Sequence, residues 1–121
     1  MECLRLYHNP DCSKSRGALA LLREHGIECE VIEYLATPPD RAELEAVLAR
    51  LPDPPADLVR EDARFRELGL DAADYQTADA VIELLLEHPE LMQRPIGVLG
   101  KRAVLARPSE RVLELTRDTR S

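Results

Sequence analysis

Cys12 is the residue whose type and position most clearly suggest chemistry in this sequence. It follows a turn-forming segment, residues 8–11, and precedes a leucine-rich segment that is typical of a helix. The free backbone N–H groups in the first turn of a helix favour an anion, and a thiolate is an anion. The pKa of the Cys12 thiol is therefore expected to fall below that of a free cysteine, about 8.5, which predicts a nucleophilic thiolate.

Hydroxyls and cations follow Cys12 directly. Ser13 and Ser15 can donate hydrogen bonds to the sulfur or to a bound oxyanion, and residues 14 and 16 add positive charge. Asp11 acts in the opposite direction, because a neighbouring carboxylate disfavours a thiolate and repels an oxyanion. The alternative is a buried, inert cysteine at a helix cap. Polar residues on both sides of Cys12 favour the reactive thiol.

Strand and helix patterns surround this cysteine. Residues 4–7 are predicted as a strand that Cys3 can extend, residues 13–25 as a helix ended by Gly26, and residues 28–34 as a second strand. Strand, helix, strand is the beginning of a βαβ unit, so the two strands are expected to be parallel.

The segment after the second strand is predicted to be helical. Residues 37–40 break the strand pattern, and Asp40 with Glu43 forms a start that resembles a capping box. One stripe of this helix is expected to be buried, namely Leu44, Val47, Leu48 and Leu51. A linker rich in proline follows at residues 51–55.

Two further helical signals follow the linker. Residues 56–70 are weakly helical. Thr77 can cap a helix that runs to His88, and Pro89 ends it. The inward face of that helix is expected to be Ala78, Val81, Ile82 and Leu85.

The C-terminal part is predicted as a hairpin and a last helix. Residues 95–99 and 102–105 form the two strands, with Gly100 and Lys101 as the turn between them. Pro108 fits the first turn of the final helix, whose inward residues are Val112 and Leu115. The overall order is β-α-β, a helical middle, then β-β-α.

The composition limits the classes of partner. The chain has 121 residues, of which 45% are apolar and 32% are charged, as is typical of one soluble globular domain. Its formal net charge is −7. A negative field disfavours nucleic acid and anionic membranes as partners. It also repels an anionic substrate at long range, so a local cluster of cations would have to bind one.

The other cysteines suggest a compartment rather than a site. Cys3 and Cys29 fall in predicted strands and are expected to be buried. An odd, small number of cysteines does not suggest a disulfide scaffold, and no signal peptide or apolar run near ~20 residues is visible. A metal site at His8 would need further ligands nearby, and the sequence offers none. We therefore expect a cytoplasmic protein whose thiols are reduced.

Five motifs carry a resemblance that covers nearly the whole chain. They are YHNPDCSKSR, EYLATPPDRAEL, LVREDARFRELGL, LLLEHPELMQRPIGV and ARPSERVLEL, in that order. Together they resemble the glutaredoxin-coupled arsenate reductase family, ArsC. The resemblance implies an α/β, thioredoxin-like fold with a mixed four-stranded sheet and a helical insertion. It also implies one domain over residues 1–121, with the thioredoxin-like core at 1–36 and 89–121 and the insertion at about 37–88.

The resemblance implies a reaction and a set of ligands. The Cys12 thiolate would attack arsenate, which Arg60, Arg94 and Arg107 would hold. Guanidinium groups bind tetrahedral oxyanions through paired hydrogen bonds and stay charged at any working pH. By composition alone, Arg60 would be a solvated residue of a charged helical segment, whereas Arg94 and Arg107 adjoin prolines and predicted strands.

Further roles follow from the same resemblance. His8 and Ser15 would support the thiolate, and Pro95 would be the cis-proline beside the active-site cysteine. No cofactor or metal is expected to be bound, and arsenate, glutathione and glutaredoxin are the expected partners. Ser15 stands where a thioredoxin-type resolving thiol would be, so an external thiol must finish the reaction.

Two alternatives remain at the level of sequence. Some relatives of this family are regulators that bind RNA polymerase, but these carry a second cysteine at the position of Ser15. Others have no established substrate, and a version of the loop such as CSKSR also fits them. A thiol oxidoreductase acting on another oxyanion or on mixed disulfides is therefore the second interpretation.

Overall fold

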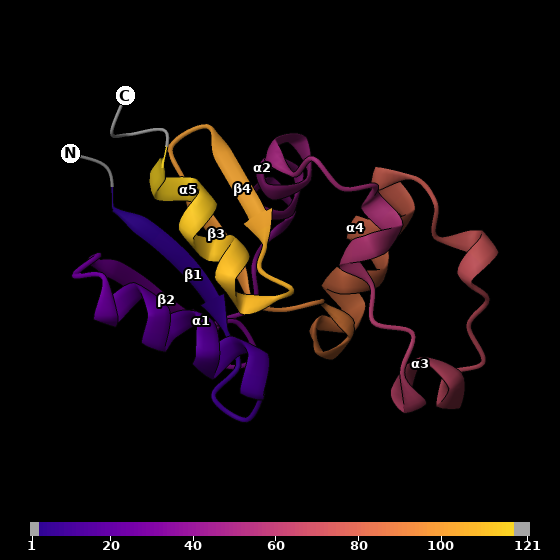
Figure 1. Ribbon diagram of the computed structural model, residues 1–121. Helices are drawn as coiled ribbons and strands as arrows, with labels where there is room; N and C mark the ends of the chain where they lie inside the picture. The colour runs from indigo at the N-terminus through magenta and orange to yellow at the C-terminus, as the bar shows by residue number, and fades with distance from the viewer. Residues whose placement is uncertain (1–2, 118–121) are drawn as a thin grey trace.

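A four-stranded mixed sheet forms the centre of the protein (Figure 1). The computed structural model describes residues 3–117. The strands lie in the order β2-β1-β3-β4, and their bounds are β1 Leu4–His8, β2 Cys29–Glu33, β3 Ile96–Leu99 and β4 Arg102–Leu105. The first two strands pair in parallel, as predicted, whereas β3 is antiparallel to both β1 and β4. This arrangement confirms the predicted α/β fold class.

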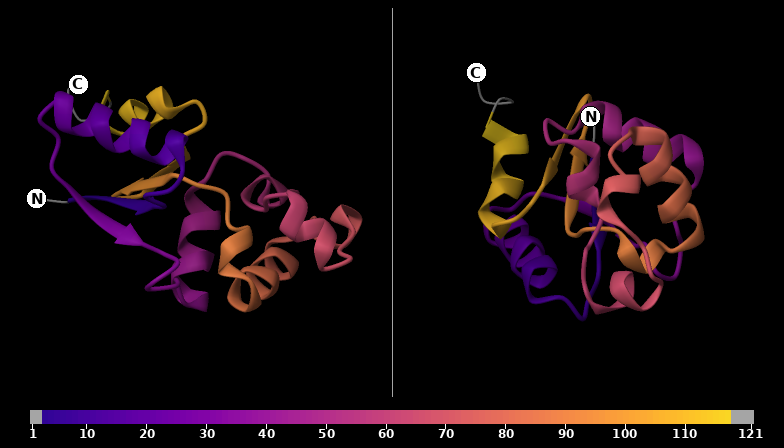
Figure 2. Two further views of the ribbon diagram at one scale, coloured as in Figure 1. Left: turned by 90° about the horizontal axis from the view of Figure 1, so that it is seen from below. Right: turned by 90° about the vertical axis from the view of Figure 1, so that its right-hand side faces the viewer.

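Helical elements occupy both faces of the sheet. In chain order they are α1 Ser13–Glu24, α2 Arg41–Arg50, η1 Pro55–Leu58, α3 Ala63–Glu67, η2 Ala72–Asp74, α4 Ala78–Glu87, η3 Pro89–Leu91, η4 Ser109–Leu113 and α5 Glu114–Arg117, where η marks a 3-10 helix. Figure 2 shows α1 and the C-terminal helical segment on one side of the sheet and α2 on the other. Within residues 3–117, no helix is long and apolar enough to cross a membrane.

The face under α1 is closely packed against the C-terminal segment. Its core contains residues of β1, α1, β4 and the last two helical elements, including Leu6, Leu22 and Leu115. Gly97 of β3 allows this approach, because a Cβ atom there would lie 2.8 Å from Leu115 Cδ1. The Ser109 hydroxyl also donates to the Lys14 carbonyl at 2.8 Å, which ties η4 to the first turn of α1.

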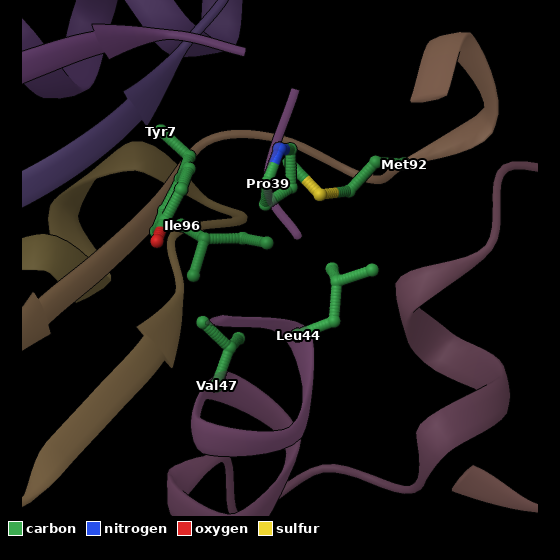
Figure 3. A pocket seen from close by; sticks show the side chains of 6 residues that line it. All are labelled: Tyr7, Pro39, Leu44, Val47, Met92 and Ile96. Carbon is green, nitrogen blue, oxygen red and sulfur yellow. The ribbon is translucent and has the colours of Figure 1, made fainter. Parts of the chain in front are cut away.

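The opposite face joins the sheet to the helical segment between β2 and β3. The side chains that meet there are Tyr7, Pro39, Leu44, Val47, Met92 and Ile96 (Figure 3). They leave no room for a water-sized molecule between them. The Tyr7 hydroxyl donates to Glu43 Oε2 at 3.0 Å, and burial followed by that contact raises the pKa of Tyr7 to about 12. The helical segment is therefore packed firmly on the sheet.

Helix starts follow the capping signals of the sequence. Asp40 Oδ1 accepts from the Glu43 N–H at 2.8 Å, and Thr77 Oγ1 accepts from the Ala80 N–H at 3.2 Å. After α1, Gly26 adopts a φ of 67°, a left-handed conformation that suits glycine.

Several local expectations are wrong. His8 belongs to β1 instead of the turn, and Ala78 is exposed. Of the two cysteines expected to be buried, Cys3 is exposed and precedes the strand, and Cys29, the first residue of β2, is only partly buried. The final helix is a 3-10 turn followed by a short α-helix, and Pro108 caps it from an extended conformation. Three residues per turn place Val112 and Leu115 on one side, facing the sheet.

Candidate functional site

Four chain segments meet at one edge of the sheet. The carboxyl ends of the parallel strands β1 and β2 lie together there, with His8 opposite Glu33. Because β3 is antiparallel to β1, its first residue, Ile96, pairs near the same end, opposite Tyr7. The last residue of β4, Leu105, pairs with Ile96. The loops that follow or precede these ends carry most of the residues expected to do chemistry.

Cys12 lies at the N-cap of α1 and is partly buried. Its backbone N–H donates to the Asn9 carbonyl at 3.0 Å. The sulfur makes no regular side-chain cap bond. Burial by itself raises the pKa of Cys12, but the backbone N–H of Ser15, the Arg94 side chain and the backbone N–H of Lys14 lower it further than burial raises it. The thiol is thus more acidic than an ordinary cysteine, as predicted from its position at a helix start.

His8, Asn9 and Ser15 form a buried hydrogen-bond network beneath the loop. Ser15 Oγ lies 2.6 Å from His8 Nδ1, and the Asn9 N–H donates to the same oxygen at 3.0 Å. Burial is the largest influence on His8 and lowers its pKa, which favours the neutral imidazole. The Ser15 hydroxyl and His8 Nδ1 therefore share one hydrogen bond between neutral groups. The hydroxyl is used within the loop, and Ser15 reaches the thiolate through its backbone N–H instead.

Arg94 is brought to Cys12 by the segment that leads into β3. The peptide bond between Arg94 and Pro95 is cis, and Pro95 is buried. The Pro95 carbonyl accepts from the Ala106 N–H at 2.9 Å, which fixes this segment to the end of β4. The Arg94 guanidinium stabilises the Cys12 thiolate, and its buried Nε has no hydrogen-bond partner among residues 3–117.

Arg107 contacts the backbone of Arg94. Its Nη1 donates to the Arg94 backbone carbonyl at 2.9 Å. A guanidinium carries five N–H donors, so one such bond does not use its capacity to bind an oxyanion. The following Arg107–Pro108 peptide bond is also cis, a feature that no motif of the sequence indicates.

Arg60 reaches the site through a short backbone pairing and not from a helix. Val59 forms an antiparallel bridge with Met92. The Arg60 N–H donates to the Leu91 carbonyl at 2.7 Å, on one side of that bridge. Arg60 Nη1 also forms an ion pair with Asp62 Oδ2 at 2.9 Å. The expectation that Arg60 lies in a helical segment is wrong, because the residue lies between η1 and α3, where its N–H pairs with Leu91.

Tyr34, the residue after β2, is a neighbour of the site that the sequence analysis missed. It was expected only to end a strand. Its hydroxyl lies close enough to Arg94 and Arg60 for their charges to lower its pKa and to Cys12 for the thiolate to raise it, although burial is the larger influence and the net pKa is raised. Asn9, expected only as a turn residue, is the other missed participant.

The charged residues Asp11 and Arg16, on either side of Cys12, make contacts within the loop and the start of α1. Arg16 Nη1 donates to the Pro10 carbonyl at 2.8 Å, so this cation closes the loop. Asp11 is exposed, and its backbone N–H donates to Asn9 Oδ1 at 3.0 Å. Within residues 3–117, no group of three or more His, Cys, Asp and Glu side chains is placed to hold a metal ion.

Comparisons with known proteins agree on one family. The model of the ArsC family matches residues 7–115. An arsenate reductase of Neisseria meningitidis is 41% identical over 93% of this chain and 97% of its own length. An arsenate reductase of Escherichia coli is 43% identical over 98% of this chain and 84% of its own. The solved structure of an arsenate reductase from Vibrio cholerae superposes with a TM-score of 0.83 at 40% identity, over 94% of this chain and 98% of that one.

Proposed function

This chain belongs to the ArsC family, and we propose that it is an arsenate reductase in which the Cys12 thiolate attacks the arsenic atom. The observation that carries the proposal is the thiol at the N-terminus of α1, whose pKa is lowered by the Ser15 N–H and by Arg94 in spite of burial. Relatives more than 40% identical over most of their length are named arsenate reductases, which supports the same substrate.

The charges of the site suit a reaction between two anions. A thiolate and arsenate repel each other, and the whole chain carries a formal charge of −7. Arg94 lies beside the sulfur, and Arg60 lies near enough to act on the same Tyr34 hydroxyl as Arg94 does. Positive groups fixed in place offset the repulsion most strongly as negative charge grows on the leaving oxygen. We assign oxyanion binding to Arg60, Arg94 and Arg107, with Arg107 also holding the Arg94 peptide.

The proposed cycle uses two thiols and moves two electrons. The Cys12 thiolate forms a bond to arsenic(V), and one arsenate oxygen leaves as water or hydroxide. A glutathione thiolate then adds to the arsenic, and a second oxygen leaves as water. The two sulfurs then join as a Cys12–glutathione disulfide and leave two electrons on arsenic, one water molecule adds to the arsenic, and it departs as arsenite. A glutaredoxin thiol attacks the glutathione sulfur of that disulfide, which returns Cys12 as a thiolate.

The placement of the other cysteines supports an external reductant. Cys29 pairs with Leu4 at the start of the parallel strands, whereas Cys12 follows their far end. Four residues of strand span about 13 Å, at roughly 3.3 Å per residue. Ser15, at the position of a resolving thiol, is buried against His8. Among the described residues, no second cysteine adjoins Cys12, so we propose glutathione and glutaredoxin as the reducing partners.

A coupled assay tests this function and separates it from a thiol reductase with another substrate. Purified protein is mixed with glutathione, glutathione reductase and NADPH, with and without glutaredoxin, and arsenate is added last. NADPH consumption that depends on arsenate and on glutaredoxin supports the proposal. Consumption with a glutathione mixed disulfide, and none with arsenate, would instead assign a disulfide reductase.

A further inference from the structure

Tyr34 lies beside the catalytic loop because of the register of the parallel strands. Glu33, the last residue of β2, pairs with His8, the last residue of β1. Asn9 follows β1 and Tyr34 follows β2, so both residues leave the sheet at the same edge. Cys12 lies on the loop that Asn9 begins. Tyr34 is therefore directed to the site by backbone pairing.

The ring of Tyr34 has a structural explanation, but its hydroxyl does not. The side chain is 0% exposed and belongs to the core that also contains Tyr7 and Met92. A phenylalanine would fill the same place. The Tyr34 oxygen is buried and makes no regular hydrogen bond among residues 3–117. The Asn9 side chain lies near enough to act on it as a weak hydrogen-bond donor, which lowers the pKa of Tyr34, but the phenolic proton has no acceptor among these residues. Burying a hydroxyl unpaired is costly, so a tyrosine here calls for a partner that comes from outside the chain.

The neighbours of that hydroxyl indicate the chemistry of the partner. Arg94 and Arg60 both act on it electrostatically, and so does the Cys12 sulfur. Arg94 Nε is a second buried donor without a partner among the described residues. Burial raises the pKa of Tyr34 more than the two arginines lower it, so the phenol keeps its proton and remains a donor. Donors without acceptors that also feel the charges of two guanidinium groups fit an oxyanion.

We propose that Tyr34 is a further catalytic residue, whose hydroxyl donates a hydrogen bond to one oxygen of the tetrahedral oxyanion held by Arg60 and Arg94 in front of Cys12. The proposal rests on the proposed function for the identity of the oxyanion as arsenate. A fixed donor of this kind strengthens its bond as charge grows on the oxygen during attack by sulfur. The hydroxyl acts on the oxyanion and not on the thiol, because it makes no hydrogen bond to sulfur.

The test is Tyr34→Phe, with Tyr7→Phe as the matched control. Each change removes one hydroxyl from a buried tyrosine, but the Tyr7 hydroxyl donates to Glu43 and is not directed at an oxyanion. Oxyanion affinity is read from protection of Cys12 against iodoacetamide by arsenate, phosphate or sulfate, with the modified peptide identified by mass spectrometry. The pH midpoint of Cys12 alkylation and the thermal midpoint are measured for the same variants.

We expect Tyr34→Phe to weaken protection, and to lower kcat/KM for arsenate, by about tenfold to a hundredfold. In Tyr34→Phe the alkylation midpoint should stay at the wild-type value, and the thermal midpoint should stay there or rise, because an unpaired buried hydroxyl is removed. Tyr7→Phe should protect as the wild type does. Unchanged protection in Tyr34→Phe would overturn the proposal, as would weakened protection that accompanies a shifted alkylation midpoint or a lowered thermal midpoint.

The protection measurement separates this proposal from the proposed function. If oxyanions protect Cys12 but arsenate is not reduced, the substrate assignment fails and Tyr34 is still judged by the Tyr34→Phe comparison. If none of the three oxyanions protects Cys12 in the wild type, the oxyanion site and the role of Tyr34 are both rejected.

Discussion

The hydroxyl of Ser15 lies 2.6 Å from Nδ1 of His8, beneath the loop that carries Cys12. The same oxygen accepts the Asn9 N–H at 3.0 Å, and all three residues are buried. One hydroxyl therefore satisfies two buried groups of the loop. The backbone N–H of the same serine faces the thiolate, so the side chain shapes the loop and the main chain stabilises the sulfur.

Ser15→Ala should affect stability more than thiol acidity. The change leaves the Asn9 N–H and His8 Nδ1 unpaired in a buried place, which costs about 1–3 kcal/mol of unfolding free energy in urea titrations. The backbone N–H that faces Cys12 remains, so the pH midpoint of Cys12 alkylation should move little. Ser13→Ala, at an exposed position of the same turn, is the control. A large rise in the alkylation midpoint of Ser15→Ala, with stability unchanged, would contradict this division of roles.

His8 should make the protein less stable in mild acid. Burial lowers the pKa of His8 in the folded state, so between pH 6.5 and that lower value the unfolded chain binds more protons than the folded one. Stability should thus fall as the pH drops below about 6.5 and level off below the folded-state pKa.

The variant His8→Asn keeps a hydrogen-bonding group near the position of Nδ1 and removes the titrating group. Its unfolding free energy, measured from pH 8 to about pH 5, should fall less steeply than that of the wild type, since the proton uptake of the unfolded chain at this position is gone. The same change at the exposed His25 serves as the control. If the unfolding free energy fell equally steeply in the wild type and in His8→Asn, the titration of His8 would not contribute to the acid sensitivity of the protein.

Arg94→Gln should raise the pKa of Cys12. The variant removes a charge and a hydrogen-bond donor from the thiolate, while the N–H groups of Ser15 and Lys14 remain. Rates of iodoacetamide alkylation across a pH series should show a higher midpoint than the wild type. Arsenate reduction should also lose at least about tenfold in kcat/KM, because a charge-assisted hydrogen bond is removed.

Arg16→Gln is the matched control for Arg94. It removes an equal charge near Cys12, from the first turn of α1, but its guanidinium donates to the Pro10 carbonyl. A shift of the Cys12 midpoint in Arg16→Gln as large as that in Arg94→Gln would show that the general field of the loop, and not the contact with Arg94, sets the acidity of the thiol.

Gly97→Ala should loosen the C-terminal segment. A Cβ atom at this position would lie 2.8 Å from Leu115 Cδ1 and 3.3 Å from Val112 Cγ2, so neighbouring side chains must shift, at a cost of about 1–3 kcal/mol. Leu115→Ala alone should cost about 2–5 kcal/mol through the cavity that it leaves. In the double variant the new methyl group has room, so urea titration should give a loss smaller than the sum of the two. Strict additivity would contradict this packing.

The architecture was accessible to sequence reasoning where periodicity and local signals agree. The strand patterns of residues 4–7 and 28–34, the capping residues Asp40 and Thr77, and the glycine after α1 each act over a few residues, and each gave a correct element. The placement of Cys12 at a helix start follows from the same local signals. In the C-terminal segment the sequence indicates a single helix, whereas the structure has a 3-10 helix followed by a short α-helix, with Val112 and Leu115 in the core under α1.

The parts of the site that escaped prediction depend on contacts between distant segments. Arg60 reaches the site because Val59 pairs with Met92, and nothing in the charged segment itself signals that pairing. Tyr34 matters because of a single unpaired oxygen, which no pattern of apolar residues can reveal. A spatial argument would have been possible, however, since the residues that follow two parallel strands leave the sheet at one edge.

The most direct test of the central claim is to measure the arsenite that the protein forms from arsenate in the presence of glutathione and glutaredoxin. Arsenite is separated by chromatography and quantified by its arsenic content, for the wild type, Cys12→Ser and the control Cys3→Ser, whose thiol is exposed and precedes β1. The account predicts repeated turnover by the wild type and Cys3→Ser, and no arsenite above the enzyme-free background with Cys12→Ser. Arsenite formation by Cys12→Ser at the wild-type rate, or none by the wild type, would contradict it.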